Sequence, residues 1–82
     1  MNIFVGNLNA LVTSSHLSDL FVRFGKVSSV EIIRDAFTGR SLGFGYIEMD
    51  TTAGEMAIQQ LDCINFMNRY MEVNEANAWP TL

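Results

Sequence analysis

Cysteine, histidine, proline and tryptophan each occur only once in this sequence. The single cysteine, Cys63, cannot form an internal disulfide, as is usual for a protein of the reducing cytoplasm. It also excludes a metal site built on a pair of cysteines. No apolar run approaches the ~18–20 residues that would cross a bilayer. From these shortages we expect a cytoplasmic protein that binds no metal ion, uses no cofactor and does not associate with a membrane.

Positive charge is also scarce, because five Lys and Arg stand against nine Asp and Glu, giving a net charge of −4. A protein that binds nucleic acid usually carries the opposite sign, since neutralised phosphates supply much of its affinity. The charge balance alone therefore argues against a nucleic-acid partner, and other features have to outweigh it.

Four segments have the alternating or β-branched character of strands, over residues 2–6, 27–34, 42–49 and 70–75. The turn-rich residues 35–41 suit a hairpin between the second strand and the third. With 82 residues, the chain is long enough for one modest hydrophobic core. We therefore expect a single domain.

Two further segments have helical periodicity. After a Thr13 cap, apolar residues recur three and four positions apart as far as Phe24, and Gly25 suits the left-handed residue that ends a helix. Residues 52–55 have the S/T-x-x-E spacing of a capping box, and the apolar face of the second helix reaches Leu61. The order is βαββαβ, and both helices are expected to cover the same side of the sheet.

Three aromatic residues are predicted on the uncovered side of that sheet. Successive side chains of a strand point to opposite faces, so an inward Ile3 leaves Phe4 outward. In the third strand an inward Ile47 leaves Phe44 and Tyr46 outward. A soluble domain rarely displays such a cluster without a use for it. Flat rings can stack on unpaired bases, and each such contact is worth about 1–3 kcal/mol.

Two motifs on these strands resemble those of the RNA recognition motif (RRM) family. Residues 42–49, Leu-Gly-Phe-Gly-Tyr-Ile-Glu-Met, resemble its octapeptide, K/R-G-F/Y-G/A-F-V-x-F/Y. Residues 3–8, Ile-Phe-Val-Gly-Asn-Leu, resemble its companion hexapeptide. The likeness covers about residues 2–76, and a chain of this size resembles the small single-domain RRM proteins of bacteria.

The resemblance implies an α+β fold of the ferredoxin-like βαββαβ type, with a four-stranded antiparallel sheet, two helices on one face, and the first and third strands at the centre. It implies a domain over residues 1–76 with a short tail over 77–82. It also implies that the ligand is single-stranded RNA, with single-stranded DNA as an alternative, and that the role lies in RNA stability or translation.

Individual roles follow from the same resemblance. Phe4 and Tyr46 would stack on two successive bases, and Phe44 would pack against the sugars between them. Asn74 and Ala76 would read base edges mainly through the backbone. The predicted RNA-binding residues are Phe4, Phe44, Tyr46, Asn2, Leu42, Arg40, Asn74 and Ala76.

Three positions depart from the family pattern. Leu42 stands where the family has Lys or Arg, so one phosphate contact is missing. Met49 replaces an aromatic at an inward position, which changes packing only. Cys63 replaces a turn glycine after the second helix, where the backbone is expected to differ locally. Gly43 and Gly45, which the pattern retains, are expected to remove side chains that would crowd the helices.

Charged residues near the rings have two interpretations each. Arg40 lies in the hairpin loop, where it can line the RNA path or remain an ordinary surface charge. Glu31, Glu48 and Glu72 are expected to project from the uncovered face, either as acceptors for base amino groups or, more simply, as solvated carboxylates.

Alternatives to RNA binding remain open from the sequence. The acidic balance, Leu42 and the apolar tail favour a protein partner, whereas retention of all three rings favours RNA. Catalysis and a small-molecule substrate are not expected, since the only histidine, His16, belongs to the first helix, whereas Cys63 follows the second. Trp79, held extended by Pro80, either reaches the exposed rings or stays in solvent.

Overall fold

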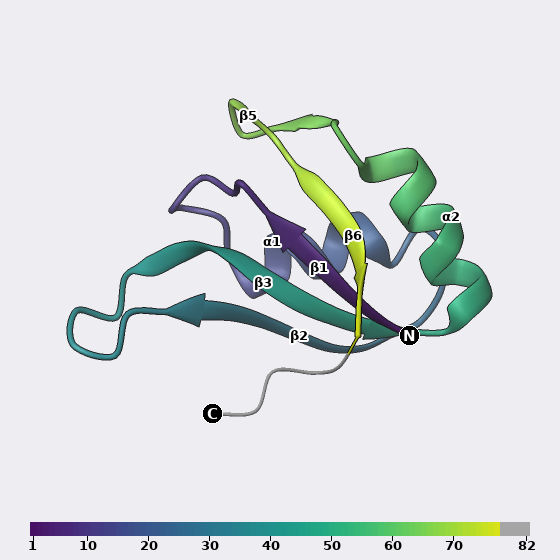
Figure 1. The fold of residues 1–82 in the computed structure, drawn as a ribbon, viewed down its shortest axis with the longest axis horizontal. Coiled ribbons are helices and arrows are strands. Elements are labelled where there is room, and N and C mark those ends of the chain that lie inside the picture. The colour runs from purple at the N-terminus through teal and green to yellow at the C-terminus, as the bar shows by residue number, and fades with distance from the viewer. Residues whose placement is uncertain (78–82) are drawn as a thin grey trace.

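The computed structural model describes residues 1–77 of the chain. Its elements in chain order are β1 (Asn2–Gly6), α1 (Ser14–Phe21), β2 (Val27–Arg34), β3 (Ser41–Met49), α2 (Thr51–Leu61), β4 (Asn65–Phe66), β5 (Arg69–Tyr70) and β6 (Glu72–Ala76). The predicted βαββαβ order is confirmed, with a small hairpin of β4 and β5 inserted before the last strand (Figure 1).

The main sheet has four strands in the order β2-β3-β1-β6, and every neighbouring pair is antiparallel. β1 and β3 therefore form its centre, as predicted. Phe4 of β1 lies opposite Tyr46 of β3 on one side and opposite Asn74 of β6 on the other. This register fixes which side chains share a face, because directly paired residues point the same way.

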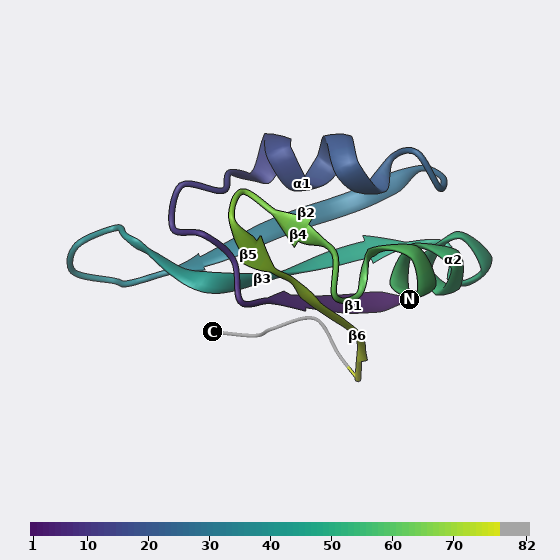
Figure 2. The same ribbon diagram turned by 90° about the horizontal axis from the view of Figure 1, so that it is seen from above.

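Both helices pack on one face of this sheet and enclose the core, while the other face carries no described helix (Figure 2). Their inward residues, such as Leu17 and Phe21 of α1 and Ala57 of α2, join the inward residues of the strands. The buried apolar residues are Ile3, Val5, Leu8, Val12, Leu17, Phe21, Ile32, Ile47, Met49, Ala53, Ala57, Leu61, Met71 and Val73.

The start of α1 is as expected, but its end is not. Thr13 caps the helix and accepts a hydrogen bond from the backbone N–H of His16. The prediction that the helix extends to Phe24 is wrong, because it ends at Phe21 and two tighter turns follow. Gly25 serves a different purpose there. A Cβ on Gly25 would lie 2.7 Å from the Cβ of Ala53, so the glycine lets this segment approach α2.

The cap of α2 also differs from the prediction. The helix begins at Thr51, and the carboxylate of Asp50 accepts hydrogen bonds from the backbone N–H groups of Thr52 and Ala53, at 3.1 and 3.5 Å. The capping box predicted over residues 52–55 is therefore wrong, since these residues already lie within the helix. Asp50 follows β3 directly, and its short carboxylate reaches the free donors of the first turn.

The last strand begins later than predicted, at Glu72 instead of Tyr70. Tyr70 belongs to the β4–β5 hairpin, where it pairs with Asn65. The turn of this hairpin uses left-handed backbone at Met67 and Asn68, with φ of 50° and 70°. Cys63 also adopts a left-handed φ of 66°, and its N–H donates to the carbonyl of Met71 at 2.8 Å.

Candidate nucleic-acid interface

The three predicted rings meet on the face of the sheet opposite the helices. The ring centroids of Phe4 and Phe44 are 5.9 Å apart, those of Phe4 and Tyr46 are 5.8 Å apart, and those of Phe44 and Tyr46 are 6.3 Å apart. All three distances lie within the range of favourable aromatic pairs. Each ring remains half-buried, so each keeps surface for a ligand. We call these three residues the ring cluster.

Gly6 determines how the Phe4 ring lies. A Cβ on Gly6 would come within 2.6 and 2.7 Å of Cε2 and Cζ of that ring, closer than real carbon atoms approach. The ring therefore extends along β1 and covers Gly6, which explains why this exposed-face glycine is buried. A side chain at this position would displace the ring.

The expectation that Gly43 and Gly45 of β3 prevent crowding against the helices is wrong. A Cβ on Gly45 would collide with the carbonyl oxygen of Glu31 and lie 3.1 Å from the Cα of Ile32, both on the neighbouring strand β2. Gly43 has a left-handed φ of 83°, and its carbonyl accepts from the N–H of Leu8 at 2.8 Å. The first glycine thus allows close strand pairing, and the second allows a local twist at the start of β3.

Other predicted site residues lie on the same face as the ring cluster. Asn2 pairs with Ala76 on β6, and Asn74 lies directly opposite Phe4. Leu42 lies at the beginning of β3 and is 53% exposed. Arg40 is farther out, in the loop between β2 and β3. The structure therefore gathers six of the eight predicted residues around the rings and leaves Leu42 and Arg40 at the margin.

Carboxylates surround the ring cluster. Glu31 lies opposite Tyr46 on β2, Glu48 lies opposite Asn2, and Glu72 lies opposite Gly6. Their register places all three on the ring face, as the alternation predicted. Negative charge around an apolar centre repels phosphates, so a nucleic acid bound here has to gain its affinity mainly from its bases.

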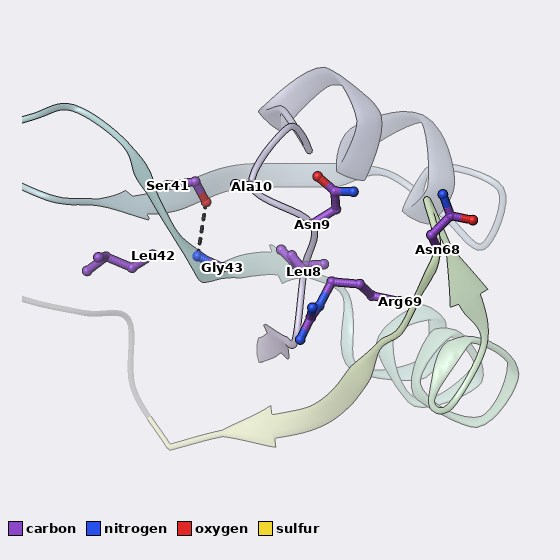
Figure 3. Close-up of a pocket in the computed structure, with 8 residues that line it drawn as sticks. All are labelled: Leu8, Asn9, Ala10, Ser41, Leu42, Gly43, Asn68 and Arg69. Carbon is purple, nitrogen blue, oxygen red and sulfur yellow. Dashed lines mark hydrogen bonds between the residues drawn. The ribbon is translucent and has the colours of Figure 1, made fainter.

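An open groove of about 500 Å³ adjoins the Leu42 end of the sheet (Figure 3). It lies between the loop after β1, the start of β3 and the β4–β5 hairpin. Its lining residues are Leu8, Asn9, Ala10, Ser41, Leu42, Gly43, Asn68 and Arg69. Apolar side chains and side-chain amides share this lining, as is common in ligand sites.

The walls of the groove are fixed by hydrogen bonds between segments far apart in the chain. Asn7 donates through its side chain to the carbonyl of Tyr70 at 2.7 Å, and Asn9 donates to that of Met67 at 3.0 Å. The guanidinium of Arg69 donates to the backbone and side-chain oxygens of Asn7, at 3.3 and 2.5 Å. The sequence left open whether Arg69 lines the RNA path or is an ordinary surface charge. It did not predict the groove, although Asn7 and Asn68 are residue types that favour left-handed turns.

Four further findings concern metal binding, membranes, the only histidine and the only tryptophan. No three His, Cys, Asp or Glu side chains among residues 1–77 are grouped so that they could hold a metal ion. None of the helices described is long and apolar enough to span a membrane. His16 is engaged in the cap of α1, where its ring nitrogen accepts from the N–H of Thr13 at 3.0 Å. Trp79, whose contact with the rings was left open, lies outside the described residues.

Comparison with known proteins points to one family. The sequence pattern described as the RNA recognition motif matches residues 3–72. The chain is 44% identical over 77 residues to RbpE, a protein of Nostoc sp. (strain PCC 7120) that is named for RNA binding. The aligned residues cover 93% of this chain and 78% of RbpE. It is 45% identical over 75 residues to the chloroplastic 29 kDa ribonucleoprotein of Arabidopsis thaliana, covering 90% of this chain but 22% of the relative.

Solved structures agree with this. The crystal structure of RNA-binding protein PG1 superposes with a TM-score of 0.95 at 43% identity, over 99% of both chains. The complex of the Sex-lethal protein with RNA superposes with a TM-score of 0.88 at 28% identity, over 96% of this chain and 48% of the other.

Proposed function

Because this chain belongs to the RNA recognition motif family, we propose that it binds single-stranded RNA on the helix-free face of its sheet. The observation that carries the proposal is the ring cluster, in which Phe4, Phe44 and Tyr46 contact one another and stay half-exposed. Relatives named for RNA binding support RNA over the protein partner that the acidic balance also allowed.

The geometry of the cluster favours single strands. The ring planes of Phe4 and Tyr46 are inclined by 69°. Two bases that each stack on one of these rings cannot remain parallel to each other, whereas the bases of a duplex are parallel. In this proposal Phe4 and Tyr46 take successive unpaired bases, and Phe44 packs against the sugars between them.

The residues around the rings would read and position the strand. Asn2, Asn74 and Ala76 lie beside Phe4 in register, where they can hydrogen-bond to base edges. Leu42 supplies apolar surface at the margin, and Arg40 supplies a cation beyond it. Stacking accepts DNA bases as well, so single-stranded DNA of the same sequence is expected to bind by the same contacts.

The rest of the proposal concerns the whole domain. Residues 1–76 would form the binding unit, and residues 77–82 would lie beyond it. The role would be recognition without catalysis, in the cytoplasm, acting on the stability or translation of the bound RNA. Membership of the RNA recognition motif family supports the RNA-binding part of this proposal.

A fluorescence titration tests the proposal. Labelled uridine-rich and guanosine-rich single strands are titrated with the parent protein and with a triple variant, Phe4→Ala, Phe44→Ala and Tyr46→Ala. The parent should bind at least one of these strands, and the triple variant should lose that binding. Met56→Ala is the matched control, since Met56 is an apolar residue of α2 that is 53% exposed. Equal RNA binding by the parent and a folded triple variant would overturn the proposal.

A further inference from the structure

The loop between β2 and β3 projects beyond the end of the sheet (Figure 1). It carries an unusually exposed aromatic ring. Phe37 at its tip is 99% exposed, whereas the next most exposed large apolar side chain in residues 1–77, that of Leu11, is 73% exposed. Because Phe37 makes no contribution to the core, the fold does not explain an aromatic residue at this position.

The loop is fixed by its own hydrogen bonds. The carboxylate of Asp35 accepts from the backbone N–H groups of Phe37 and Thr38, at 2.8 and 2.9 Å. The N–H of Gly39 donates to the carbonyl of Asp35 at 2.9 Å, and the N–H of Asp35 donates to the carbonyl of Arg40 at 2.8 Å. Phe37 is therefore held out in solvent by a defined turn, and a ligand that contacts it does not have to order the loop.

The charge of this loop also differs from that of the rest of the molecule. Arg34 and Arg40, two of the five Lys and Arg of the chain, lie at its base and are exposed. The only acidic residue between them, Asp35, is committed to the turn. The backbone N–H groups of Thr38 and Phe37 hold the pKa of Asp35 below its usual range. The loop thus carries one flat ring and two exposed cations on a protein of net charge −4, and the guanidinium of Arg34 also donates to the carbonyl of Gly39 at 3.3 Å.

We propose that Phe37 is a fourth stacking ring, which takes one further base of the bound RNA while Arg34 and Arg40 contact the adjoining phosphates. A nucleotide combines the two features that this loop fits, a planar aromatic base and an anionic phosphate. The inference rests on the proposed function and extends its footprint along the same strand.

The position of the loop determines which nucleotide this is. The chain passes from Ser41 to Phe44 along β3, a distance of about 10 Å at ~3.3 Å per residue, and Phe37 lies farther out. A base on Phe37 therefore cannot be the immediate neighbour of a base on the ring cluster. At least one spacer nucleotide has to cross the exposed Leu42. Only an RNA longer than the ring cluster needs can reach both sites.

Comparing two RNA lengths tests this. A tetranucleotide chosen for binding to the ring cluster and an octanucleotide that contains it are titrated with the parent and with Phe37→Ala. The variant should bind the octanucleotide about 5-fold or more weakly and the tetranucleotide as well as the parent does. Phe37→Trp should retain the octanucleotide affinity. Leu11→Ala, which also removes an exposed apolar side chain, is the control and should change neither.

Two outcomes would overturn the inference. One is unchanged octanucleotide binding by Phe37→Ala, which would assign the ring to another partner such as a protein. The other is equal weakening of both lengths, which would point to a general disturbance of the domain. Neither affects the proposed function, which is tested by loss of tetranucleotide binding in the triple variant of the ring cluster.

Discussion

Along β3, neighbouring side chains meet two different environments. Ile47 and Met49 are almost completely buried under the helices, at 0% and 2% exposure, while Phe44 and Tyr46, which precede them, stay half-exposed on the other face. The covered face is largely aliphatic, which suits close interdigitation in a core. The uncovered face holds flat rings, which leave stacking surface available. The comparison indicates that stability and binding are assigned to alternate residues of the same strand.

The largest effect is expected on the covered face. Ile47→Ala should lower the free energy of unfolding by about 2–5 kcal/mol, because it leaves a cavity in the core. Urea denaturation measures this change. The neighbouring Tyr46→Ala removes a larger side chain but should cost less stability, since its ring is only half-buried. Equal losses of unfolding free energy in the two variants would show that the two faces do not differ in their contribution to stability.

The next effect concerns the uncovered face. Phe4→Ala, Phe44→Ala and Tyr46→Ala should each weaken binding to a single-stranded oligonucleotide about 5- to 100-fold, the equivalent of about 1–3 kcal/mol of stacking. Fluorescence anisotropy gives the affinities, and circular dichroism checks that each variant remains folded. If any of them binds as tightly as the parent, that ring has no part in stacking.

A smaller effect is expected at a position on neither face. Cys63 has a left-handed φ of 66°, which a residue with a Cβ adopts only at a cost. Cys63→Gly should therefore stabilise the domain by about 0.5–1 kcal/mol and leave RNA affinity unchanged. Cys63→Ala keeps the Cβ and serves as the control in the same thermal or urea unfolding series. A glycine variant no more stable than the alanine variant would show that the backbone there is not strained.

The smallest effect is electrostatic. With Leu42 in the place of a basic residue, about two or three phosphates meet a cation, which predicts a slope of log K against log salt of about −1.5 to −2. Leu42→Lys should tighten binding and steepen the slope by about 0.7, without changing the preferred bases. Affinities over a series of salt concentrations give the slope. A parent slope steeper than about −4 would mean many more phosphate contacts than the structure identifies.

Alternation was sufficient to predict the ring face from the sequence. A strand has a period of two, so the inward Ile3 and Ile47 determined where Phe4, Phe44 and Tyr46 point. The pairing of Phe4 with Tyr46 was not predicted, because an antiparallel arrangement of the two central strands leaves their register open. The direction of the rings therefore needs only the local pattern, whereas their pairing needs the structure.

The helix ends and the groove could not be predicted in this way. Asp50 and Thr52 are both good caps, and the choice between them depends on where β3 ends. The groove requires Asn7 to contact Arg69, a hydrogen bond across 62 positions in the chain. It also requires left-handed backbone at Met67, a residue type that gives no signal for it. These features depend on tertiary structure.

RNA is expected to contact the helix-free face of the sheet, and an NMR titration observes this contact at the rings themselves. The ring protons of the phenylalanines and tyrosines are followed as a single-stranded oligonucleotide is added to the parent protein. Large shifts are expected for Phe4, Phe44 and Tyr46 and almost none for Phe21, the fully buried last residue of α1. Unmoved ring-cluster signals in the presence of bound RNA, with shifts at Phe66 beside His16 instead, would place the interface on the helix side and overturn the proposed function.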